Sequence, residues 1–229
     1  MMTILRKLTP GGFLGKLLFL LAAAALLVLA FSFLFASRTI FDLLLENRKL
    51  KQALGNLTQE YQIGYAKVVS QETRDGRTIS RIRFAETDRK DSNRVIARGE
   101  YEIEGDLIHF DALIVTFDKQ LVMDGKARAL YLWRRIYGDT MAPENGYPLA
   151  VSGEEPARYA DVFRELPLRD RRLFWAEIWQ LANEPERLKK AGVSAIYGNV
   201  VYRKMRPGLI YIFKIDNSGR VYPDTVPDF

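Results

Sequence analysis

A chain of 229 residues with 48% hydrophobic residues is long and apolar enough to form one compact domain or two small ones. The sequence has no cysteine, which excludes disulfides, thiolate nucleophiles, iron–sulfur clusters and cysteine-bound zinc, and a single histidine excludes His-rich metal sites. The 34 basic and 28 acidic residues give a net charge of +6, which is too even to indicate specific nucleic-acid binding.

Residues 17–36 form an uncharged, mostly apolar run that follows a short tail, residues 1–16. At about 1.5 Å per residue, this run matches the roughly 30 Å hydrocarbon layer of a membrane. The apolar region of a cleaved signal peptide is shorter, about 7 to 15 residues, and a buried helix of a soluble protein would need some polar face. We therefore predict a retained signal anchor that crosses the membrane once.

Basic residues stand on both sides of this run, so the positive-inside rule gives only a weak orientation. Those on the N-terminal side are unopposed by acidic residues, whereas Asp42 and Glu46 accompany those on the C-terminal side. We expect a cytoplasmic N-terminus and an extracytoplasmic C-terminal domain, either periplasmic or extracellular.

A heptad pattern predicts a juxtamembrane helix over residues 38–63. Positions a are 40, 47, 54 and 61, and positions d are 43, 50, 57 and 64. An asparagine at one a position, here Asn47, fixes the register of a two-stranded coiled coil, and Glu46 at g faces Lys51 at e of a parallel partner helix. The residues expected to self-associate are Ile40, Leu43, Glu46, Asn47, Leu50, Lys51, Leu54 and Leu57.

Two glycines limit this pattern to about three heptads, the minimum for a coiled coil. Gly55 weakens the helix and Gly64 occupies the last d position. The alternative is a single amphipathic helix that folds onto the following domain. Tethering to a membrane favours the homodimer, because it raises the effective concentration of identical helices.

The period then changes from helix to strand, and residues 65–140 predict an antiparallel meander of about five strands whose first turn is Asp75–Gly76. A linker rich in turn formers covers residues 141–156. Residues 157–229 predict helices followed by a C-terminal β-hairpin, which we expect to pack on the helices or to extend the first sheet. The fold class is α+β, as one unit or two closely packed lobes.

The sequence offers few candidates for catalysis. Glu100, Glu102 and Glu104 share one face of a predicted strand, where they could bind a hard cation or act as an acid/base pair, although an exposed outer face is the commoner role. His109 could pair with Asp111, but a lone strand histidine is usually structural. We expect no cofactor and no metal site.

Arginine alternates with aromatic residues in two predicted strands, a composition used to bind single-stranded nucleic acid, lipid headgroups or glycans. The residues that would form such a ligand surface are Arg134, Arg135, Tyr202 and Arg203. Ordinary sheet packing explains the same pattern. Trp175 and Trp179, one helical turn apart, are better explained as core residues than as a ligand site.

The layout of tail, span, heptad helix and β-rich domain resembles that of bacterial envelope scaffolds such as MreC. The first 60 residues, including "ENRKLKQAL", resemble the FtsB and FtsL division proteins. This resemblance implies protein assembly at a membrane. The leading hypothesis is a non-enzymatic scaffold that binds an envelope protein and self-associates; the alternatives are a membrane-anchored enzyme that uses carboxylates and a module that binds lipid or glycan.

Overall fold

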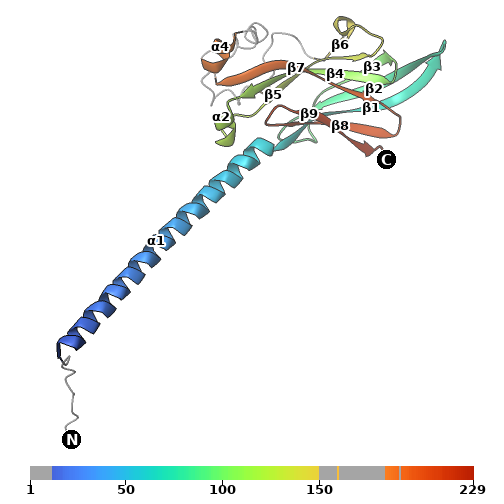
Figure 1. The fold of residues 1–229 in the computed structure, drawn as a ribbon. Coiled ribbons are helices and arrows are strands. Elements are labelled where there is room, and N and C mark those ends of the chain that lie inside the picture. Colours follow the sequence, from blue (N-terminus) through green and yellow to red (C-terminus); the bar gives the residue numbers. More distant parts are fainter. Residues whose placement is uncertain (1–11, 150–158, 160–183, 191) are drawn as a thin grey trace. The chain divides into compact units, whose positions relative to one another are not determined.

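The computed structural model describes residues 12–149, 159, 184–190 and 192–229, and Figure 1 shows their fold. The chain divides into two compact units, residues 1–51 and 52–229. The helices are α1 (Gly12–Thr58), α2 (Lys119–Met123) and α4 (Pro185–Lys190), with a 3-10 turn η1 (Pro143–Asn145). The strands are β1 (Glu60–Arg74), β2 (Arg77–Thr87), β3 (Val95–Glu104), β4 (Leu107–Phe117), β5 (Leu130–Gly138), β6 (Tyr147–Pro148), β7 (Val193–Lys204), β8 (Leu209–Asp216) and β9 (Val221–Pro227).

Helix α1 agrees with the predicted membrane helix. Among the described residues it is the one helix that is long and apolar enough to cross a membrane. Its large apolar side chains from Leu17 to Phe35 are 43–73% exposed, as a surface that contacts lipid would be. The helix continues through Gly55 and ends at Thr58, so the last two positions of the heptad pattern, Tyr61 and Gly64, lie in β1.

The predicted antiparallel meander is present, and its first hairpin has the expected turn. Asp75 and Gly76 have φ angles of 51° and 78°, the left-handed conformations that a tight hairpin turn requires. Strands β1, β2 and β3 pair in sequence, and β8 and β9 join them to give a five-stranded sheet of order β3-β2-β1-β8-β9. The chain ends in a hairpin, β8–β9, which extends the first sheet, one of the two expected positions. The strand before the predicted Arg206–Gly208 turn, β7, does not pair with β8 as the sequence suggested, because it pairs with β4 in another sheet.

The structure adds that the meander divides after β3. Strands β4 and β5 belong to a second sheet of order β6-β5-β4-β7, which β6 extends from within the predicted linker. Gly105, with φ +103°, makes the corner between the two sheets. Gly138 lies against the same corner, because a Cβ atom there would be 2.3 Å from the carbonyl oxygen of Glu104.

The two sheets of the second unit pack face to face around an aromatic cluster. Phe84 and Phe213 of the first sheet meet Phe110 and Trp133 of the second, with ring centroids 4.5–5.9 Å apart. The indole Nε1 of Trp133 donates a hydrogen bond of 3.3 Å to the carbonyl oxygen of Ile63. The β1–β8 register shifts between Gln62 and Gly64, so Ile63 has no paired residue on β8. The indole therefore supplies a hydrogen-bond donor for the Ile63 carbonyl oxygen at this irregularity.

Two of the predicted helices lie outside the described residues. They are the segments 157–166, of which only Tyr159 is described, and 168–183, which contains Trp175 and Trp179. The third predicted helix is α4, which begins at Pro185, where a first-turn proline is favourable.

Candidate functional site

The three glutamates on β3 each meet an arginine. Arg83 Nη2 lies 2.6 Å from Glu100 Oε1, and Arg77 Nη1 lies 3.2 Å from Glu104 Oε2. The glutamate side chains, that of Glu102 included, are 35–45% exposed. This arrangement is a ladder of exposed ion pairs across neighbouring strands.

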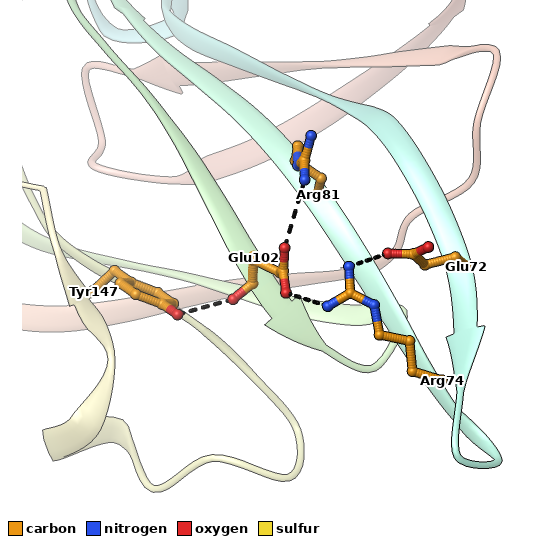
Figure 2. Close-up of polar contacts among 5 residues, drawn as sticks. All are labelled: Glu72, Arg74, Arg81, Glu102 and Tyr147. Atoms are coloured by element: carbon orange, nitrogen blue, oxygen red, sulfur yellow. Dashed lines mark hydrogen bonds and ion pairs between the residues drawn. The ribbon is translucent and has the colours of Figure 1, made fainter.

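Glu102 is at the centre of this ladder, and Figure 2 shows its contacts. Its carboxylate lies 2.8 Å from Arg74 Nη1 and 3.6 Å from Arg81 Nη2, and Arg74 also contacts Glu72. Hydrogen bonds to Glu72 and Glu102 raise the pKa of the Arg74 guanidinium. The Tyr147 hydroxyl donates to the Glu102 carbonyl oxygen at 2.9 Å. Because arginines occupy the carboxylate oxygens of the β3 glutamates, these oxygens do not converge on a metal ion. Within the described ranges, no group of three His, Asp or Glu residues could hold a metal.

A buried carboxylate, Asp111 on β4, brings Arg134 and Arg135 together. Arg134 donates to Asp111 Oδ1 from Nε at 3.1 Å and from Nη2 at 2.5 Å, and Arg135 Nε lies 3.7 Å from Oδ2. Consecutive side chains of a regular strand point to opposite faces, but the register of β4 and β5 shifts between Asp111 and Ala112, which leaves Arg134 as an extra residue. The irregularity explains how both arginines reach one carboxylate.

The outer face of this sheet also carries a row of rings across three strands. His109 on β4 stacks on Tyr137 of β5, with centroids 4.9 Å apart and planes 2° apart, and its centroid lies 5.6 Å from that of Tyr202 on β7. Burial and the charge of Asp111 raise the pKa of Tyr137. The predicted pairing of His109 with Asp111 is not seen, because the described hydrogen bonds to Asp111 come from Arg134. His109 instead packs between the rings of Tyr137 and Tyr202.

The predicted ligand surface is thus only partly assembled. Arg134 and Arg135 share Asp111, and Tyr202 lies on the same face with 57% of its surface exposed. Arg203 is exposed at the free side of β7, where its Nη1 donates to the carbonyl oxygen of Tyr202 at 3.0 Å. The structure therefore gives the first two arginines a structural role, and it leaves Tyr202 and Arg203 accessible.

The residues predicted to self-associate differ in exposure. Ile40, Leu43, Leu50 and Leu54 are 51–59% exposed. Leu57 is partly buried and packs against the core of the β-rich unit. Any helix–helix interface would consequently end near Leu54.

A polar network around Arg89 has no counterpart in the sequence analysis. Arg89 donates to the carbonyl oxygen of Ala129 and, at 2.6 Å, to Asn217 Oδ1, and its guanidinium lies 3.8 Å from the ring centroid of Tyr61. Asn217 in turn donates to the carbonyl oxygen of Asn56 at 2.6 Å. Burial lowers the pKa of Arg89 below its ordinary value. This network joins the last turn of α1 to the β8–β9 turn, and its members are too far apart in sequence to form a recognisable motif.

Comparison with known proteins gave no matching family model, no similar curated protein and no similar solved structure.

Proposed function

We propose that the chain is a single-pass membrane scaffold. In this proposal the juxtamembrane part of α1 self-associates, and the α+β domain binds an envelope protein on the extracytoplasmic side. The observation that carries the proposal is the exposure of apolar side chains of α1 that follow the membrane-spanning residues 17–36. Ile40, Leu43 and Leu50, at heptad positions a and d, form an apolar stripe and are each more than half exposed, and the neighbouring Phe41 and Leu44 are exposed as well. Burying one such side chain contributes about 1.5–3 kcal/mol, which a membrane-tethered pair of helices can use for association.

Polar residues within the stripe support a parallel, two-stranded arrangement. Asn47 would face Asn47 of the second helix, and Glu46 would lie near Lys51 of that helix. Because Leu57 packs within its own domain, the stripe available for association extends from Ile40 to Leu54.

The partner-binding part of the proposal draws on the exposed apolar side chains of β7. Val200 and Tyr202 are 40% and 57% exposed and share one face of the strand, while Tyr197, 38% exposed, is on the opposite face and donates to the carbonyl oxygen of Gly219. Apolar side chains gathered on an exposed strand are typical of protein-binding surfaces. The carboxylates considered for an enzyme are in ion pairs, and Arg134 and Arg135, considered for lipid or glycan, are held by Asp111.

Disulfide crosslinking of the full chain in native membranes tests self-association. The sequence has no cysteine, so Asn47→Cys introduces a unique thiol, and we expect it to give a disulfide-linked dimer. Arg48→Cys is the matched control, because the next heptad position, b, points away from the seam. Monomer at both positions, or equal crosslinking at both, would contradict the proposal.

The orientation has a separate test. We expect a reporter that works only outside the cytoplasm to be active when it is fused after Phe229. Activity of a reporter that works only in the cytoplasm would overturn the exported domain.

A further inference from the structure

The strands at the edges of the two sheets differ in their protection against pairing with another chain. On β3 the Tyr147 hydroxyl occupies the carbonyl oxygen of Glu102, and β9 contains Pro223 and Pro227. Strand β6 has two residues. Strand β7 is also at an edge, but it has twelve residues and no proline. Side chains occupy two carbonyl oxygens near the C-terminal end of β7, since Tyr211 donates to that of Lys204 at 3.2 Å and Arg203 to that of Tyr202. Within the described ranges, the middle of β7, from Ile196 to Val201, is thus an edge segment with neither a proline nor a side chain bonded to its carbonyls.

The backbone of β7 offers hydrogen-bonding groups on its free side. Arg203 Nη1 reaches the carbonyl oxygen of Tyr202, so this carbonyl points away from β4. In an antiparallel ladder the N–H and C=O of one residue point to the same side, and alternate residues repeat this direction. Val200 and Gly198 therefore present their backbone groups on the same side as Tyr202. No backbone hydrogen bond between these groups and a further strand occurs among the residues that the structure describes.

The segment that contains β7 is basic in sequence, although Lys204 pairs with Asp106 at 3.1 Å and Arg187 pairs with Glu184. Residues 184–206 contain six basic and two acidic side chains, a net charge of +4 within a chain whose total is +6. Lys189 and Lys190 are exposed before the strand, and Arg203 and Arg206 are exposed at its other end. This charge complements an acidic ligand, whereas a second copy of the chain would bring the same positive charge to the interface.

From these observations we infer that β7 receives an extended, acidic segment of a partner protein, which pairs with it as a fifth strand of the second sheet. The inference rests on the proposed function, because it specifies how the α+β domain meets its protein partner. Backbone hydrogen bonds would supply the pairing, apolar side chains would pack on Val200 and Tyr202, and carboxylates would meet the flanking cations.

A binding assay with the full chain in detergent micelles tests the inference. The probe is a fluorescein-labelled peptide of alternating glutamate and valine, as long as β7, and anisotropy reports binding. We expect saturable binding that weakens with added salt. Replacing the central valine of the peptide by proline, or introducing Val200→Pro into the chain, should weaken binding about tenfold, the effect of losing one or two backbone hydrogen bonds.

Charge reversal separates the contribution of β7 from general attraction to a basic protein. Arg203→Glu should weaken binding and reduce its salt dependence, whereas Arg98→Glu, the same change on the β3 edge, should leave binding unchanged. Equal binding of the intact and proline-containing peptides would overturn the inference, as would equal effects of the two reversals or no binding up to about 1 mM peptide.

Two further outcomes are informative. If Val200→Pro dissociates a dimer of the purified chain, the occupant of β7 is a second copy and the inference is wrong. If Asn47→Cys crosslinks in membranes but the peptide does not bind, strand addition fails while the proposed self-association stands.

Discussion

Removing the charge of Asp111 is expected to destabilise the β-rich unit. The substitution Asp111→Asn keeps the size of the side chain but takes away the charge of the carboxylate that contacts both Arg134 and Arg135. Both guanidinium groups would then lose the buried carboxylate that they share. The loss should appear as lower stability and not as a change of fold.

The expected magnitude follows from burial and geometry. The Asp111 side chain is 5% exposed, and it accepts two hydrogen bonds from Arg134. Breaking a fully buried ion pair costs about 3–5 kcal/mol, but Arg134 is 24% and Arg135 31% exposed and can regain some hydration. We therefore expect a loss of about 2–3 kcal/mol, which for a unit of this size lowers the melting temperature by roughly 4–12 °C.

Thermal unfolding of the detergent-solubilised chain, followed by circular dichroism, measures this loss. Glu102→Gln is the matched control: it removes an ion-paired carboxylate whose side chain is 45% exposed, and should cost about 1 kcal/mol or less. The double variant Asp111→Asn, Arg134→Gln should recover part of the loss, because it also removes one of the two cations that the Asp111 carboxylate balances. An Asp111→Asn variant no less stable than Glu102→Gln would refute the argument.

Two other predictions concern the same unit. Asp88 accepts a hydrogen bond from the backbone N–H of Lys90, and this bond lowers the pKa of the Asp88 carboxyl in the folded chain. The ionised carboxylate therefore stabilises the fold above the unfolded pKa of about 3.9, and this stabilisation is lost as the pH falls through the folded pKa. In urea titrations, Asp88→Asn should be less stable than the parent at neutral pH but equally stable at about pH 2. Gly138→Ala should lower the urea midpoint by the equivalent of about 1–3 kcal/mol, because the added Cβ atom would clash with the carbonyl oxygen of Glu104. Gly55→Ala is the control: its Cβ atom would meet nothing within 4 Å on a helix, so it should be neutral or stabilising. Equal effects of the two substitutions would contradict the close approach at Gly138.

Local patterns predicted the elements well because each is determined by neighbouring residues. Alternation of apolar and polar residues indicated the strands, and Asp75–Gly76 indicated the first hairpin because left-handed backbone favours these residue types. The apolar run of residues 17–36 indicated the long helix, since its length alone matches a membrane.

The arrangement of these elements depends on contacts between distant residues, which no local pattern encodes. The turn at Gly105 is short enough for a hairpin, yet it passes the chain from one sheet to the other. The shared contact of Arg134 and Arg135 with Asp111 depends on an irregular ladder, and regular alternation would have separated the two side chains. Arg89 and Asn217 bond across 128 residues of sequence, so their pairing is visible only in the fold.

The strand order also bears on how the domain can be made during synthesis. Strand β1 pairs with β8 and β4 pairs with β7, so each sheet is completed by the C-terminal part of the chain. Until residues 193–216 have left the ribosome, β1 and β4 each keep one side unpaired, and neither sheet can cover the aromatic cluster fully. Such pairings between distant segments form slowly and leave strand edges open to aggregation in the meantime. Nascent chains of this protein would therefore need protection until synthesis is nearly over, and a premature stop before residue 193 would produce a species with two open sheets.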